Sequence, residues 1–190
     1  AEGAFHYHSD SHTTPKLFMD AMKNYLQQNG VKLNTNEEVM HISSKEDKVE
    51  ITTSLRSYIT DEVVIAAGSW SENMAKKLGF YIPVQAGKGY CINIDSPTGI
   101  KHPTILMEAN AAVTPMAGFT RFAGTMEIAG LNETIRKERV EAIAAAAKRF
   151  YNNVEFSSQA KSKATFGFRP VSPDGVPFIG KIKKQRNITV

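Results

Sequence analysis

The sequence predicts an α/β (α+β) protein whose domains are interleaved along the chain. Three observations lead to this fold class: helical and strand patterns alternate, residues 61–67 resemble a strand buried on both faces of a layered sheet, and after Gly79 prolines and glycines punctuate strand-like runs. The 190 residues, 42% hydrophobic and 22% charged, suffice for a sizeable core. This composition excludes a disordered, collagen-like or low-complexity chain.

The first half of the chain predicts one helix, a strand meander and a strand–turn–helix unit. Pro15 suits the first turn of a helix that begins after Thr14, and Gly30 suits its end. Short apolar runs separated by polar turns predict the meander over residues 31–34, 38–42 and 49–59. The apolar strand 61–67 then ends at Gly68, and we expect a helix over residues 69–78.

The second half predicts a different domain, which the chain enters near Tyr81. Its strand-like runs are residues 89–94, 104–108, 111–116 and 119–125, the last two joined by a tight turn at Ala117 and Gly118. Asn132 is placed to cap a long helix over residues 133–151. The chain then returns through a strand at 163–168 and a proline-rich turn to a last strand.

Charge and cysteine content restrict the possible partners and compartment. The net charge of +4 is scattered, which favours small anions as partners and argues against nucleic acid, for which a clustered basic face is typical. Cys91 is the single cysteine and excludes an intrachain disulfide, which indicates a reducing compartment. No apolar run approaches the roughly 20 residues of a transmembrane segment. We therefore expect a cytoplasmic protein, with peripheral contact to the inner face of the membrane as an alternative.

The first group that could carry chemistry is a run of alternating polar residues near the N-terminus: His6, His8, Asp10 and His12. On a strand all four side chains would face the same way and form a possible metal face. No cysteine and no helical histidine pair joins them, so we expect a cleft wall or an exposed segment and no metal site.

Two further motifs have the residue types of a ligand site. Ala66, Ala67 and Gly68 end a strand before a helix, where small residues let a phosphate or nucleotide approach the backbone. Arg169 lies at the end of a strand, and Pro170 and Pro173 restrict the backbone around Arg169 and Asp174. A guanidinium fixed in this way can grip a carboxylate with two parallel hydrogen bonds. The alternatives are an ordinary strand end and an arginine paired with a structural carboxylate such as Asp174.

Two segments together carry a family resemblance: GFRPVSPDGVPFIG at residues 167–180 and DEVVIAAGSWSENMAKKLGFYIPVQAGKGY at residues 61–90. The sequence resembles the FAD-dependent D-amino-acid oxidase and dehydrogenase superfamily, which includes glycine and sarcosine oxidases, and within it bacterial D-amino-acid dehydrogenases most. The resemblance implies a partial FAD-binding, Rossmann-like domain, residues 1–80 and 165–190, interleaved with a mixed-sheet substrate-binding domain, residues 81–164.

The resemblance also implies site residues. Val39, Ala66, Ala67 and Gly68 match positions that approach the adenosine diphosphate part of FAD in relatives, and Arg169 matches the arginine that holds the substrate carboxylate. The implied reaction is oxidative deamination of a D-amino acid, with hydride transfer from the α-carbon to flavin N5 and with oxygen or a quinone as electron acceptor. Tyr90, Met107, Glu108 and Met116 could line the substrate pocket, although such residues are more often core.

The family's G-x-G-x-x-G turn is absent, and the chain begins without Met and ends on NITV. We therefore expect an interior fragment that is inactive by itself, and whether it retains FAD stays open. The alternatives are a related glycine, sarcosine or imino-acid oxidase and, for the fragment alone, a non-catalytic carboxylate-binding module.

Overall fold

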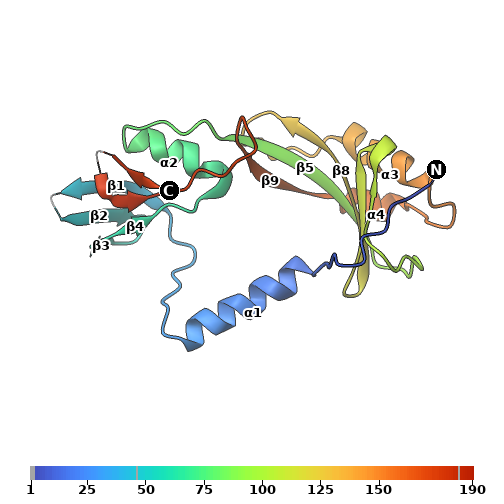
Figure 1. Cartoon of the computed structure of the whole chain (residues 1–190), viewed down its shortest axis with the longest axis horizontal. Coiled ribbons are helices and arrows are strands. Elements are labelled where there is room, and N and C mark those ends of the chain that lie inside the picture. Colours follow the sequence, from blue (N-terminus) through green and yellow to red (C-terminus); the bar gives the residue numbers. More distant parts are fainter. Residues whose placement is uncertain (1–2, 46, 184) are drawn as a thin grey trace. The chain divides into compact units, whose positions relative to one another are not determined.

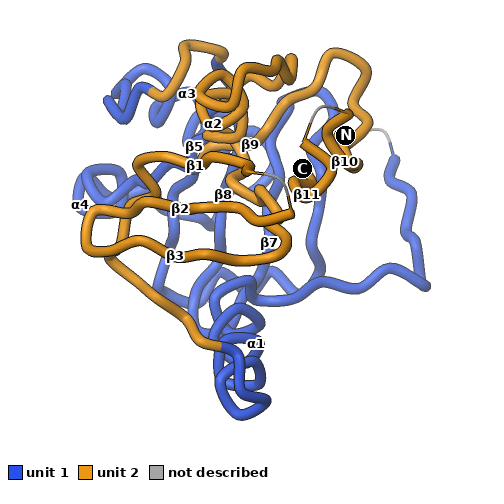
Figure 2. Tube along the Cα trace, turned by 90° about the vertical axis from the view of Figure 1, so that its left-hand side faces the viewer, with its two compact units in different colours: residues 1–31, 88–127, 132–167 blue, residues 32–87, 128–131, 168–190 orange. Residues whose placement is uncertain are grey.

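A computed structural model of the chain describes residues 3–45, 47–183 and 185–190. The chain divides into two compact units, coloured separately in Figure 2. Unit 1 comprises residues 1–31, 88–127 and 132–167, and unit 2 comprises residues 32–87, 128–131 and 168–190. The sequence analysis groups residues 1–80 together, whereas residues 1–31 cluster with unit 1. The assignment of cofactor and substrate domains stays a prediction.

Unit 1 begins with an exposed segment and helix α1 (Pro15–Gln28), which confirms the first predicted helix. Pro15 occupies its first turn, and Gly30 follows its end with a φ of +81°, a conformation that glycine adopts without steric cost. No residue of α1 is buried. Thr14 Oγ1 accepts a hydrogen bond of 3.1 Å from the Ala117 backbone N–H, which ties the start of this helix to unit 1.

A five-stranded sheet has the strand order β6-β7-β8-β5-β9, and β5, β8 and β9 are labelled in Figure 1. Its strands are β5 (Gln85–Ile94), β6 (Thr104–Leu106), β7 (Ala111–Met116), β8 (Phe119–Ile128) and β9 (Thr165–Val171). A short 3-10 helix, η2 (Met107–Ala109), precedes β7. As the sequence predicts, β7 and β8 form an antiparallel hairpin with Met116 opposite Phe119.

Helix α3 (Lys137–Lys148) supplies one side of the core of unit 1. Its residues Val140, Ile143, Ala144 and Ala147 are buried with strand residues such as Phe122. The predicted start at residue 133 is wrong, because Asn132 Oδ1 accepts from the Thr134 N–H and closes a turn before the helix. A short helix, α4 (Ser158–Ser162), leads into β9.

Unit 2 contains the predicted meander as a three-stranded antiparallel sheet of β1 (Val39–Lys45), β2 (Lys48–Thr53) and β3 (Ser57–Thr60) (Figure 2). The predicted strand over residues 31–34 is wrong, because these residues have no strand assignment and β1 has only β2 as a partner in this sheet. An apolar run becomes a strand only where another strand satisfies its backbone groups.

The second sheet of unit 2 joins distant parts of the chain. Strand β11 (Gln185–Thr189) pairs in parallel with β4 (Val63–Val64) and antiparallel with β10 (Lys181–Ile182). A 3-10 turn, η1 (Gly68–Trp70), and helix α2 (Ser71–Lys77) follow β4. The predicted strand 61–67 is therefore shorter than expected. It is not buried on both faces either, because β4 is the last strand of its sheet and Val64 is 69% exposed.

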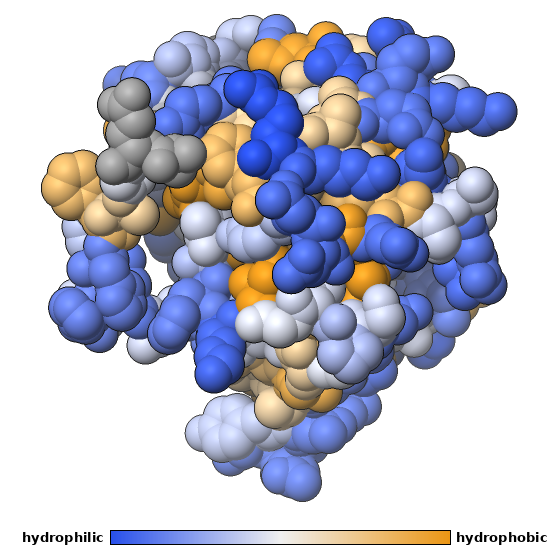
Figure 3. All heavy atoms as spheres, turned by 90° about the vertical axis from the view of Figure 1, so that its right-hand side faces the viewer, coloured by the Kyte–Doolittle hydropathy of each residue, from blue (hydrophilic) through white to orange (hydrophobic). Residues whose placement is uncertain are grey.

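The surface seen in Figure 3 is largely hydrophilic, with separate hydrophobic patches between the polar residues. None of the helices in the part of the chain that the structure describes combines the length and the hydropathy of a membrane span.

Candidate functional site

The turn after β4 presents exposed backbone at the end of a parallel strand. The Ile65 N–H donates to the Thr189 carbonyl at 2.8 Å, so the β4–β11 pairing extends to the residue before the turn. Ala66 and Gly68 are exposed, and Gly68 has a φ of +55° with open space where a Cβ would lie. Ligands of α/β sheets bind beyond the carboxyl ends of parallel strands, and this turn occupies such a position.

Ser69 gives a second indication of a ligand at the same turn. Its side chain is only 6% exposed, and its Oγ is buried without a hydrogen-bond partner among the described residues. Buried polar atoms are rarely left unpaired, so an orphaned hydroxyl beside an open backbone turn fits a bound group. The predicted helix start at Ser69 is displaced, since the 3-10 turn η1 comes between the strand and α2.

Val39 and Ala67 lie on different elements but belong to one apolar cluster. Val39 is the first residue of β1, is half-buried and lies opposite Thr53. Both side chains pack against an apolar cluster of unit 2 whose buried members are Ile42, Val49, Ile65, Leu78 and Ile188. The start of the meander and the turn after β4 thus share a common support.

Arg169 lies on β9 with an exposed side chain. Among the described residues it forms no ion pair, and the alternative partner Asp174 instead accepts from the Val176 N–H at 3.1 Å in a local turn. Pro170 restricts the backbone of Arg169 to the extended region. The guanidinium is therefore presented from a defined strand position and has its hydrogen-bonding capacity available for an external carboxylate.

The two motifs singled out in the sequence, the turn at residues 66–70 and the segment 167–175, meet within unit 2. The rings of Trp70 and Phe168 pack edge to face, with centroids 5.6 Å apart and an interplanar angle of 86°. Trp70 closes the 3-10 turn and Phe168 directly precedes Arg169, so one aromatic contact joins the two motifs.

Unit 1 contains a buried ionic network that the sequence analysis missed. The Lys88 ammonium, fully buried, lies 2.7 Å from Glu127 Oε1 and donates to the carbonyls of Asn132 at 2.7 Å and Thr134 at 2.8 Å. The Tyr90 hydroxyl donates to the same Glu127 oxygen at 2.8 Å. The sequence feature that could have indicated this network is Lys88 itself, a lysine between Gly87 and Gly89 in a mostly apolar strand.

Both members of this buried pair are held in their charged forms. Desolvation alone would lower the pKa of Lys88, but its contacts with Glu127 and Tyr90 outweigh it and raise this pKa above its usual range. The hydrogen bond from Lys88 and then that from Tyr90 lower the pKa of Glu127. Since all three ammonium hydrogens have acceptors, Lys88 holds the fold of unit 1 and is not poised as a base. Tyr90 is accordingly a buried member of the unit 1 core, which is the alternative to a place in the wall of the substrate pocket.

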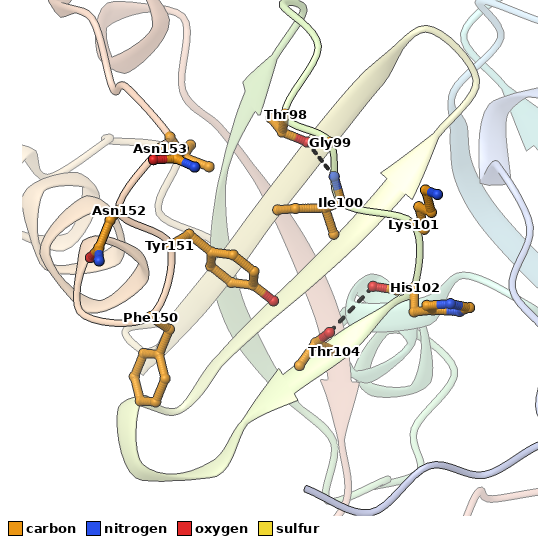
Figure 4. A pocket seen from close by; sticks show the side chains of 11 residues that line it. Thr98, Gly99, Ile100, Lys101, His102, Thr104, Phe150, Tyr151, Asn152 and Asn153 are labelled. Carbon is orange, nitrogen blue, oxygen red and sulfur yellow. Dashed lines mark hydrogen bonds between the residues drawn. The ribbon is translucent and has the colours of Figure 1, made fainter. Parts of the chain in front are cut away.

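Two cavities lie away from these residues. One of about 530 Å³ in unit 1 is bounded by the loop at residues 98–104 and by residues 150–154; Tyr151 points toward this loop in Figure 4. The dashed bonds there join loop residues to each other, from the Ile100 N–H to Thr98 Oγ1 and from Thr104 Oγ1 to the His102 carbonyl. A second cavity of about 590 Å³ in unit 2 has charged walls. Neither is lined by a predicted site residue.

The N-terminal histidines do not form the arrangement that a metal face would need. Residues 3–12 have no strand assignment, and the side chains of His6, His8, Asp10 and His12 are exposed. His6 instead packs against His8 and His102, with ring centroids 4.2 Å and 5.4 Å apart. Within the described ranges, no group of three or more His, Cys, Asp or Glu residues is arranged to hold a metal ion.

Comparisons with known proteins agree on one family. The family model described as "FAD dependent oxidoreductase" matches residues 1–190. The D-amino acid dehydrogenase of Vibrio vulnificus is 32% identical over 170 residues, which cover 87% of this chain and 40% of the relative. The chain thus spans about two fifths of the length of this curated relative.

Solved structures show the same fold. The glycine oxidase from Geobacillus kaustophilus superposes with a TM-score of 0.79 at 20% identity, covering 90% of this chain and 46% of that one. The L-proline dehydrogenase from P.horikoshii also has a TM-score of 0.79, at 18% identity, covering 92% of this chain and 48% of that one.

Proposed function

Because the chain belongs to the FAD-dependent oxidoreductase family, we propose that it is part of a whole flavoprotein that oxidatively deaminates D-amino acids. The observation that carries this proposal is the exposed Arg169, free of ion pairs among the described residues and joined through Phe168 to the turn at residues 66–70. The name of the Vibrio vulnificus relative, a D-amino acid dehydrogenase, supports the substrate class.

In this proposal the turn after β4 contributes to the FAD site. Ala66, Ala67 and Gly68 offer backbone that the cofactor can approach closely, and the backbone of Val39 would lie at the adenine. The open space at Gly68 and the orphaned Ser69 hydroxyl fit such a bound group. When bound, FAD supplies the acceptor for the hydride that leaves the substrate α-carbon. The pyrophosphate-binding G-x-G-x-x-G turn would come from outside this chain.

Arg169 would act as the carboxylate anchor of the substrate. Two parallel hydrogen bonds from a guanidinium fix both the position and the plane of a carboxylate. With the carboxylate fixed, the α-carbon hydrogen of one enantiomer faces the flavin, and orientation contributes to the rate. No side-chain base is required once the amine is neutral.

A second candidate within the family is oxidation of glycine, sarcosine or an imino acid. This candidate is supported by the names of two fold neighbours, a glycine oxidase and an L-proline dehydrogenase. Arg169 would serve either candidate, since all these substrates carry a carboxylate. For the chain alone, without the remainder of the flavoprotein, we propose weak carboxylate binding and no catalysis. Electrons would pass from the whole protein to oxygen or to a quinone, and a quinone acceptor would require contact with the inner face of the membrane.

The test is anaerobic bleaching of the visible flavin band in the whole flavoprotein. The titrants are matched D- and L-amino acids, glycine and sarcosine. Bleaching by D-amino acids alone is the expected result. Bleaching by glycine or sarcosine in preference would select the second candidate, and no bleaching by any titrant would refute both. A yellow or colourless preparation of the 190-residue chain would report separately whether it retains flavin.

A further inference from the structure

Trp70 and Phe168 connect two elements that are far apart in the sequence but belong to the same unit. Trp70 ends the turn that begins at Gly68, and Phe168 lies on β9 directly before Arg169. Their edge-to-face geometry, with ring centroids 5.6 Å apart, is the arrangement that aromatic pairs prefer. This contact is the direct physical link between the proposed cofactor turn and the proposed substrate anchor.

Side chains alternate between the two faces of β9, and this alternation relates Phe168 to Arg169. Phe166 and Phe168 are half-buried, whereas Gly167 and Arg169 are exposed, so Phe168 and Arg169 project from opposite faces of the strand. When the Trp70 ring holds Phe168 on one face of β9, it therefore also sets the direction in which Arg169 leaves the opposite face. Pro170 restricts the backbone on the other side of Arg169.

Trp70 is exposed enough to act as a positioning residue without being part of the core. Its side chain is 49% exposed, and it is absent from the apolar clusters that hold unit 2 together. Truncating it should therefore leave the fold intact while it removes the ring that Phe168 packs against. Trp70 is the single tryptophan of these 190 residues, so its spectroscopic signal can be assigned in a preparation of this chain by itself.

We propose that Trp70 is a positioning residue for the carboxylate anchor: its ring, packed on Phe168, sets the direction in which Arg169 projects. This inference rests on the proposed function. An aromatic pair of this geometry corresponds to roughly a 2- to 10-fold change in an equilibrium constant. The expected consequence is a change in the affinity for the substrate carboxylate, with a limiting rate of flavin reduction that stays close to that of the unchanged protein.

The experiment is anaerobic flavin reduction by D-alanine in the whole flavoprotein. Trp70→Leu should raise the half-saturating D-alanine concentration about 2- to 10-fold. Trp70→Phe, which keeps a ring, should stay within about twofold of the unchanged protein. Tyr81→Leu is the matched control, because Tyr81 is a 70% exposed aromatic residue of the same unit. In an Arg169→Ala background, Trp70→Leu should have no further effect, as expected if the tryptophan acts through the arginine.

Three results would overturn the proposal. An additive effect of Trp70→Leu in the Arg169→Ala background would show that Trp70 does not act through Arg169. Loss of flavin from Trp70→Leu at unchanged D-alanine affinity would limit Trp70 to holding the cofactor turn. No bleaching of the unchanged protein by any amino acid would refute the proposed function and the positioning role with it. In that case, loss of the near-UV circular dichroism of Trp70 in Phe168→Leu, measured on the 190-residue chain, would still report the aromatic contact.

Discussion

Replacement of Lys88 by methionine tests how unit 1 holds a buried charge. Methionine keeps most of the length of the side chain but removes the ammonium. The carbonyls of Asn132 and Thr134 then lose this donor, and Glu127 loses its buried cation and keeps only the hydrogen bond from Tyr90. Removing one partner of a buried ion pair costs about 3–5 kcal/mol, because the other charge stays buried. Arg136 and Arg139 lie 3.5 and 3.8 Å from Glu127 Oε2 and partly compensate for the lost charge, so we expect the lower limit.

The assay is thermal unfolding followed by far-UV circular dichroism at pH 7. A loss of about 3 kcal/mol lowers the Tm of a chain of this size by roughly 6–12 °C. Lys16→Met is the matched control, because Lys16 pairs with Asp20 at 2.8 Å but is 82% exposed, and exposed pairs contribute about 0–1 kcal/mol. Equal Tm shifts for Lys88→Met and Lys16→Met would refute the reasoning.

The pH dependence of the Lys88→Met effect follows from the two pKa shifts. The pKa of Glu127 is lowered by Lys88 and Tyr90, so its contribution is present above its unfolded pKa of about 4.3 and is lost as the pH falls through the folded value. The pKa of Lys88 is raised, so its contribution is complete below about pH 10 and is lost only at higher pH. The difference between the proteins should stay constant from about pH 6 to 9 and shrink in acid. Adding Glu127→Gln to Lys88→Met should restore part of the stability.

Three further predictions concern unit 2. Arg169→Ala should raise the half-saturating D-alanine concentration of the whole flavoprotein at least roughly 30-fold, since loss of a desolvated charge pair costs about 2 kcal/mol or more, and Arg169→Lys should fall in between. Gly68→Ala should lower the free energy of unfolding by about 1 kcal/mol in urea titration, because Gly68 has a φ of +55°, whereas Gly180→Ala should be nearly neutral. Glu37→Gln should lower the Tm at pH 7, and this difference in Tm should shrink in acid. The hydrogen bond from Thr53 is the largest cause that lowers the pKa of Glu37, and this stabilisation is lost as the pH falls through the folded pKa.

Local patterns in the sequence were sufficient for the elements whose formation depends on near neighbours. Helix α1 and the β7–β8 hairpin were predicted because the residues that start and end a helix, and those that form a tight turn, act over a few positions. The predicted strand at residues 31–34 failed for the complementary reason. A strand depends on a partner elsewhere in the chain, and its own residues carry no information about whether that partner exists.

The candidate site divides in the same way. The sequence by itself determined the family and the two motifs that carry the proposed site, since their small residues, prolines and arginine are visible without coordinates. Only the tertiary structure decided that Trp70 packs on Phe168, and that Lys88 is a buried, fully paired cation. Both contacts join residues distant along the chain, and their energies depend on distance, ring orientation and exclusion of water. Those quantities arise when strands from separate segments pair, so no local pattern could encode them.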